Sequence, residues 1–252
     1  MEKYKIVGYP TILLLKPDGE ELDRIVGANK PEKFLVSLEG FRTGSTYLSN
    51  YLTRLEDSPN DVDLMFKIAE KYTDRGDSEN AKEYFSQVVE TSKNDEQKAT
   101  ASYELAMFDL KEDKTESVSK FANEFGETEL GIRAGMKLAG YFEKKKELEK
   151  AYKTYWKVVE KNPRNANALN AFAWFSAENE MHLEKALEAA IVAVKVSEKS
   201  PQIVDTLAEV YFRMGKNKEA IESIQMAIDK DPEDSYYKEQ LEKFKKAQTA
   251  NK

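Results

Sequence analysis

The stretch PQIVDTLAEVYFRMGKNKEAIESIQMAIDKDPED, which runs from Pro201 to Asp234, decides the fold of most of the chain. Its apolar residues recur at helical spacing in two blocks, which end at Gly215 and Pro232. The residues that share one helix face are Leu207, Ala208 and Tyr211 in the first block and Ala220, Ile224 and Ala227 in the second. Small residues let helix backbones approach closely, and a bulky side chain would overpack that contact at a cost of about 1–3 kcal/mol. The stretch therefore predicts a tightly packed pair of helices.

The same frame recurs upstream along the chain. Matching units occupy residues 62–95, 132–165, 166–200 and 201–234, with a divergent unit at 99–131. In the divergent unit Val118 and Phe125 replace the expected alanines. The 34-residue period, with small residues at positions 8, 20 and 27, resembles the tetratricopeptide repeat (TPR). This resemblance implies a mainly α fold: a right-handed α-solenoid of about five helix pairs, closed by a polar capping helix over residues 235–247.

The first forty residues follow a different pattern. Residues 11–15 form an unbroken apolar run that predicts a strand buried on both faces, and a turn at Asp18-Gly19 leads to a second strand over residues 21–26. Together with Gly8, Pro10, Arg24, Gly27 and the helical pattern from Pro31 to Phe41, this stretch resembles the C-terminal half of a thioredoxin fold. Residues 42–61 are predicted to be a linker with a short helix.

The thioredoxin resemblance implies that Pro10 is the cis proline of a substrate-binding loop. That family carries its Cys-x-x-Cys motif in the first half of the fold, which has no counterpart here. We therefore expect residues 1–41 to be an incomplete ββα segment and the chain to be a fragment of a longer thioredoxin–TPR protein. Two strands cannot bury enough surface to fold alone. Alternatively, Pro10 begins a strand and has no function of its own.

The TPR resemblance also implies that a peptide or protein binds on the concave face made by the first helix of each pair. Groove positions at the two ends of the array include Phe66, Glu70 and Phe212. The main candidate groove residues are Tyr103, Met107, Met136, Asn167, Asn170, Trp174, Asp205 and Glu209. Tyr, Met and Trp suit a partner with an apolar or aromatic segment, and the asparagines suit a peptide backbone.

A different role for the groove aromatics is that they pack between repeats. For Tyr103 and Met107 both interpretations stay open, and for Trp174 we expect partial packing with one edge exposed. In TPR proteins that clamp a C-terminal carboxylate, position 9 of the first helix carries an asparagine. Here position 9 is occupied by Glu70, Met107, Gly140, Trp174 and Glu209. The sequence therefore does not predict a carboxylate clamp.

Composition limits the remaining functions. The 252-residue chain has a formal net charge of −7, which disfavours nucleic-acid binding, and no apolar run is long enough to span a membrane. It has no cysteine, hence no disulfide or thiolate metal site, and its one histidine, His182, has no evident partners for metal or acid–base chemistry. We expect no metal, cofactor or catalytic site. Residues 1–5 show no signal-peptide pattern, which predicts a cytoplasmic protein if Met1 is the true start.

Three functional hypotheses follow. The first is a non-catalytic scaffold that binds a protein or peptide through its concave face. The second is that the chain recruits substrate for a thioredoxin-like thiol-disulfide oxidoreductase or redox-linked chaperone whose Cys-x-x-Cys half is absent here. The third is homo-oligomerisation through edge pairing of the 11–15 strand.

Overall fold

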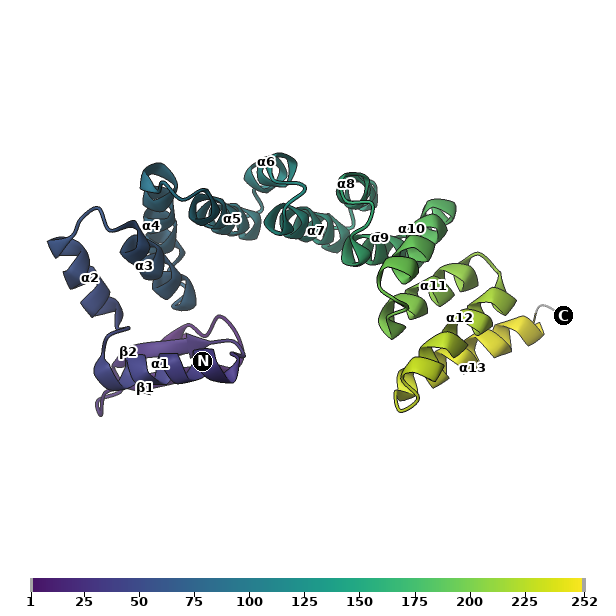
Figure 1. Cartoon of the computed structure of the whole chain (residues 1–252), viewed down its shortest axis with the longest axis horizontal. Helices are drawn as coiled ribbons and strands as arrows, with labels where there is room; N and C mark the ends of the chain where they lie inside the picture. Colours follow the sequence, from purple (N-terminus) through teal and green to yellow (C-terminus); the bar gives the residue numbers. More distant parts are fainter. Residues whose placement is uncertain (1, 251–252) are drawn as a thin grey trace. The chain divides into compact units, whose positions relative to one another are not determined.

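The computed structural model describes residues 2–250, and Figure 1 shows that helices make up the chain beyond the first two strands. The chain divides near residue 117 into two compact units. Among the residues described, no helix is both long enough and apolar enough to cross a membrane. The predicted mainly α fold, a TPR-like solenoid of helix pairs preceded by a ββα segment, is confirmed.

The first unit contains a short 3-10 helix, two strands and five complete helices. Their bounds are η1 Glu2–Tyr4, β1 Thr11–Leu15, β2 Glu21–Val26, α1 Pro31–Thr43, α2 Leu48–Asp57, α3 Val62–Asp74, α4 Ser78–Thr91 and α5 Asp95–Lys111. The strands pair antiparallel, with Thr11 opposite Val26 and Leu13 opposite Arg24. The predicted hairpin and closing helix therefore form, at nearly the predicted residues.

The expectation that β1 is buried on both faces is wrong for the described chain. Ile12 and Leu15 are exposed, because β2 is the only strand paired with β1 in the residues the structure describes. Large exposed hydrophobic side chains are concentrated in this part of the chain: Val7, Tyr9, Ile12, Leu15, Leu35, Val36 and Leu38. The ββα segment thus carries several uncovered apolar side chains.

Helices α3 and α4 form the first complete pair, and α4 also packs on α5. Each helix of the pair begins at an aspartate cap: Asp61 accepts a hydrogen bond from the Leu64 amide at 2.9 Å, and Asp77 from the Asn80 amide at 3.2 Å. The fully buried contact residues of the pair are Ile68, Ala69, Ala81, Phe85 and Val88. Two of them, Ala69 and Ala81, occupy the small-residue positions of the repeat frame.

The second unit continues the series of helix pairs. Its helices are α6 Glu116–Glu124, whose first turn reaches back to the boundary, α7 Glu129–Lys144, α8 Leu148–Lys161, α9 Ala166–Glu178, α10 Leu183–Val196, α11 Pro201–Arg213, α12 Asn217–Lys230 and α13 Ser235–Ala250. From α7 onward each helix packs on the next, and α9 also packs on α11, which is the neighbour pattern of a solenoid. The buried alanines at these contacts are Ala139, Ala151, Ala173, Ala186, Ala193, Ala208, Ala220 and Ala227.

The divergent repeat lies at the boundary between the two units, with α5 in the first unit and most of α6 in the second. Helix α5 begins at Asp95 rather than Ala99, because the Asn94 side chain accepts hydrogen bonds from the two amides that follow Asp95. Helix α6 is short, and the Phe121 and Phe125 rings stack with centroids 4.5 Å apart at its end. A Cβ atom at Gly131 would collide with the Phe125 carbonyl, so only glycine lets α7 start this close to α6.

Candidate functional site

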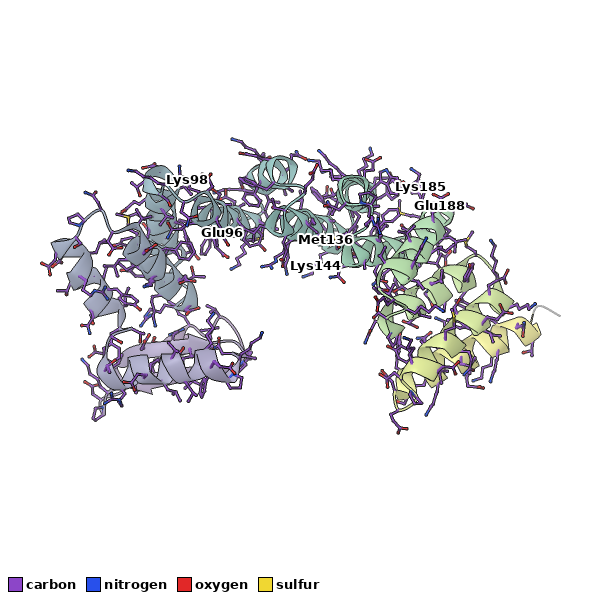
Figure 2. The ribbon with its side chains drawn as sticks, in the orientation of Figure 1. Glu96, Lys98, Met136, Lys144, Lys185 and Glu188 are labelled. Atoms are coloured by element: carbon purple, nitrogen blue, oxygen red, sulfur yellow. The ribbon has the colours of Figure 1, made fainter. Side chains whose placement is uncertain are left out.

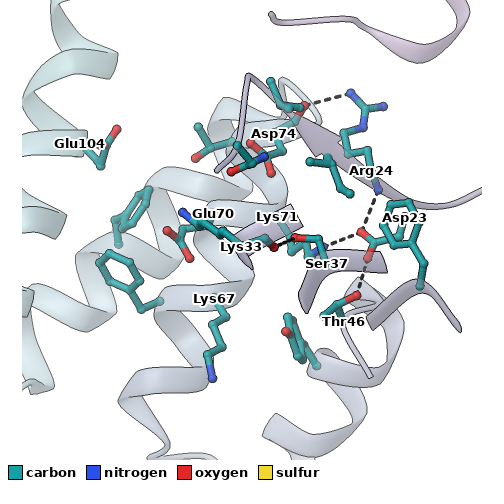
Figure 3. Close-up of a pocket in the computed structure, with 18 of the residues that line it drawn as sticks. Asp23, Arg24, Lys33, Ser37, Thr46, Lys67, Glu70, Lys71, Asp74 and Glu104 are labelled. Atoms are coloured by element: carbon teal, nitrogen blue, oxygen red, sulfur yellow. Dashed lines mark hydrogen bonds and ion pairs between the residues drawn. The ribbon is translucent and has the colours of Figure 1, made fainter. Parts of the chain in front are cut away.

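A buried aspartate joins the N-terminal segment to the first repeat. The Asp23 side chain, on β2, is completely inaccessible to solvent and accepts hydrogen bonds from Lys71 Nζ on α3 at 2.6 Å and from Thr46 Oγ1 at 2.7 Å. Arg75 approaches the same carboxylate at 3.7 Å. Figure 3 shows Lys71 and Thr46 on either side of the Asp23 carboxylate. Because a buried charge must be paired, these contacts fix the position of β2 against α3.

The neighbouring Arg24 makes a second set of contacts. Its guanidinium is buried and donates to the backbone carbonyls of Asp74 at 2.9 Å and Tyr4 at 2.7 Å, and it forms an ion pair with Glu21. Both Asp23 and Arg24 therefore attach the N-terminal segment to the C-terminal end of α3. The sequence showed Arg24 only as part of the thioredoxin resemblance, and its role as an anchor to the repeat was missed.

These anchors form one wall of a cleft within the first unit. The cleft has a volume of about 370 Å³ and is bounded by β2, α1, α3 and α5, with Phe85 of α4 at its base; we call it the α3–α5 cleft. Its principal lining residues are Ile25, Asn29, Lys33, Ser37, Phe41, Tyr51, Phe66, Lys67, Glu70, Asp74, Phe85, Thr100 and Glu104. Figure 3 shows Lys33 and Ser37 of α1 facing Glu70 of α3 across it.

The cleft combines aromatic and charged groups. Phe66 and Phe85 meet edge to face with ring centroids 5.5 Å apart. Desolvation by the surrounding protein raises the pKa of Glu70, and the charge of Asp74 raises it further, whereas Lys33 lowers it. Burial likewise raises the pKa of Asp74. Such a site can bind an apolar side chain on the rings and polar groups at the rim.

Phe66 and Glu70, which the repeat frame predicts as groove positions, both line the cleft. The frame could not show that α1 lines the opposite side. Helix α5 carries two further predicted groove residues. Tyr103 is only 6% exposed, and Met107 is half-buried, so both take part in packing of the first unit. Their contact with a ligand stays a prediction.

In the second unit, α9 presents three predicted residues along one face. Asn167 is exposed, and Trp174 is 37% exposed, in keeping with partial packing. The Oδ1 atom of Asn170 is buried and has no hydrogen-bond partner among the described residues. A buried carbonyl oxygen without a partner is unusual. Met136 lies half-buried on α7 (Figure 2).

The last two predicted groove residues are covered by α13. Glu209 is 3% exposed and pairs with Lys243 of α13 at 2.6 Å and with Arg213 at 2.7 Å. Asp205 accepts a hydrogen bond from the Tyr236 hydroxyl at 3.3 Å, and burial raises the pKa of Asp205 to about 6. In this structure both carboxylates therefore contact the capping helix instead of facing solvent.

The remaining sequence candidates lie apart from these surfaces. The Tyr9–Pro10 peptide bond is cis, and Pro10 is exposed. The thioredoxin resemblance of residues 1–41 stays a prediction, since the structure itself shows a two-stranded sheet and a helix. The His182 ring stacks on Tyr152 at 3.9 Å. Within residues 2–250 no cluster of His, Asp and Glu is arranged to hold a metal ion.

Comparisons with known proteins agree with this architecture. Residues 206–234 match the tetratricopeptide repeat family model. The chain has the tetratricopeptide-repeat fold. A TPR protein from Parabacteroides merdae ATCC 43184 is similar with a TM-score of 0.57 at 16% identity, over 75% of this chain and 74% of that one. The MamA protein gives a TM-score of 0.52 at 17% identity, over 70% of this chain and 94% of that one. No curated protein matches the sequence.

Proposed function

We propose that this TPR chain is a non-catalytic interaction scaffold and that the α3–α5 cleft binds an extended segment of a partner protein. The TPR fold supports an interaction role in general. The observation that carries the specific proposal is a cleft with α3 and α5 on one side and, on the other, β2 and α1, which come from outside the repeats. Buried Asp23 and Arg24 fix β2 against α3. A fixed wall lowers the ordering cost of binding, because the site is formed before the ligand arrives.

The lining of the cleft defines the ligand chemistry. Phe66 and Phe85 provide an apolar base for an aromatic or aliphatic side chain, which would anchor the segment by burial. Lys33, Lys67 and Glu70 surround that base with charges that can pair with polar parts of the same segment. The partner segment is therefore apolar at its centre and polar on both sides.

Helix α9 supports a second contact region in the other unit. Asn167 is exposed on this helix and can bond a peptide backbone, and the partly exposed Trp174 lies on the same helix.

The experiment begins with display selection of random peptides on the whole chain. The selected peptides are then titrated against two matched variants, Thr100→Trp and Thr91→Trp. Both threonines donate their hydroxyl to the carbonyl one helical turn earlier, at 2.9 Å for Thr100 and 2.6 Å for Thr91, but only Thr100 lines the cleft.

A tryptophan at position 100 fills the cleft, so we expect at least tenfold weaker binding, equivalent to about 1.4 kcal/mol. Thr91→Trp should bind like the unmodified chain. Equal affinities of the two variants for every selected peptide would refute the α3–α5 cleft as the binding site.

The exposed outer edge of β1 favours homo-oligomerisation as a second candidate. In the described residues β1 pairs with β2 alone, and Ile12 and Leu15 are exposed beside the open edge. An edge strand of this kind can pair with a second copy. The mass in solution should then rise with concentration, and Leu13→Pro should abolish that rise; a constant monomer mass would exclude the interaction.

A further inference from the structure

A second pocket lies on the second unit. It has a volume of about 200 Å³ and is formed between α6, α7 and α8. Three lysines of α8, Lys153, Lys157 and Lys161, line it. Because they are spaced four residues apart, they lie along one face of the helix. We call this site the α8 lysine pocket.

The charge of this pocket is opposite to that of the chain. Its lining contains three lysines and no aspartate or glutamate, although the whole chain carries a net charge of −7. Some lysines elsewhere pair with carboxylates: Lys82 pairs with Glu112 at 2.6 Å, and Lys243 pairs with Glu209 at 2.6 Å. Lys153 and Lys157 have no such ion pair within the part of the chain that the structure describes.

Hydrogen bonds and close helix packing hold the walls of the pocket in place. Lys161 Nζ donates to the Asn123 carbonyl at 2.7 Å, and Asn162 Nδ2 donates to the Gly126 carbonyl at 2.8 Å, which ties the end of α8 to the α6–α7 connection. A Cβ atom at Gly135 would lie 2.5 Å from Val158 Cγ2, so α7 and α8 are in close contact beneath the lysines. The floor consists of small and aliphatic residues: Ala122, Gly131, Gly135, Leu138 and Val158.

We propose that the α8 lysine pocket binds an acidic segment of a partner polypeptide. Lys153 and Lys157 would pair with Glu or Asp carboxylates, while an adjacent aliphatic side chain would rest on the glycine- and alanine-lined floor. Charge complementarity supports this partner, since unpaired cations attract carboxylates and repel basic segments. The site is formed by α6, α7 and α8 and shares no lining residue with the α3–α5 cleft.

The test uses the whole chain and a fluorescein-labelled peptide in which glutamate alternates with leucine, measured by fluorescence anisotropy at low salt. The same peptide with glutamine in place of glutamate is the ligand control. The variant K153Q/K157Q removes the two unpaired cations. The matched control, K195Q/K230Q, removes two exposed lysines on α10 and α12 that do not line the pocket.

Because K153Q/K157Q loses two exposed ion pairs with the peptide, we expect it to bind the peptide roughly tenfold more weakly than the unmodified chain does. We expect K195Q/K230Q to stay within about twofold of the unmodified chain and the glutamine peptide not to bind. Amide resonances of Gly126 and Gly135 should shift on titration with the acidic peptide. Equal weakening of both variants, absence of binding, or shifts confined to other regions would overturn the proposal. Displacement of the peptide by inorganic phosphate, but not by chloride at equal ionic strength, would show a general anion site and overturn it as well.

Discussion

Removal of the Asp23 carboxylate tests how the N-terminal segment is held. Asp23→Ala leaves Lys71, whose side chain is only 15% exposed, without its partner at 2.6 Å, and leaves Thr46 without an acceptor. Breaking a buried ion pair typically costs about 3–5 kcal/mol. Because the contact joins two segments far apart in sequence, this cost falls on the docking of β2 against α3, while the repeats themselves should stay folded.

Hydrogen exchange of the β2 amides measures this docking directly. A cost of about 3 kcal/mol predicts exchange roughly a hundredfold faster in Asp23→Ala, with the amides of α9 and α11 unchanged. The isosteric variant Asp23→Asn, which removes the charge and keeps the shape, should show most of the effect.

The matched control is Glu39→Ala in the same segment. Glu39 pairs with Arg42, but the two side chains are 58% and 73% exposed, so solvent screens the pair and its loss should leave the exchange of β2 nearly unchanged. If Asp23→Ala and Glu39→Ala accelerated exchange of β2 equally, or neither did, the buried ion pair would not be what fixes the segment.

Two further predictions concern the second unit. Gly131→Ala should lower the free energy of unfolding by about 1–3 kcal/mol, because its Cβ collides with the Phe125 carbonyl. Gly140→Ala, in the same helix, should be neutral or stabilising. Thermal unfolding of the two variants tests this, and equal melting temperatures would contradict it. Burial raises the pKa of Asp205 to about 6, above the value of about 3.9 in an unfolded chain. The folded state therefore binds the proton more tightly than the unfolded state. The contribution of Asp205 to the free energy of unfolding should fall as pH rises from about 4 to 6. Asp205→Asn can still accept a hydrogen bond from Tyr236 but cannot bind the proton. In this variant the free energy of unfolding, measured with urea, should depend less on pH between about 4 and 6. An unchanged pH dependence would show that the buried carboxylate is not its source.

The repeat helices could be predicted because their contacts are local and periodic. Ala208, Ala220 and Ala227 are fully buried where the 34-residue frame put them, since small residues at fixed spacing are required wherever two helices pack closely. The divergent repeat was predicted less well. There Asn94 starts the helix early and Phe125 changes the packing, and neither effect belongs to the repeat pattern.

The candidate site could be predicted only in part. The frame indicated Phe66 and Glu70, because groove positions follow from helix phase. It could not show that α1 would close the cleft or that Asp23 would pair with Lys71, since ion pairs between distant segments leave no periodic signal. For the same reason Glu209 was predicted to face a ligand, although Lys243 of α13 covers it. Two adjacent charged residues inside a strand, Asp23 and Arg24, were the available hint.

Photo-crosslinking from the cleft tests the central claim most directly. A peptide selected on the whole chain is mixed with two variants that carry p-benzoylphenylalanine, one at Lys67 on the cleft rim and one at Glu90, an exposed position of α4 that does not line the cleft. If the α3–α5 cleft is the binding site, the peptide should crosslink from position 67 and not from position 90. Crosslinking from neither position by a peptide that binds tightly, or from both to the same extent, would contradict the account.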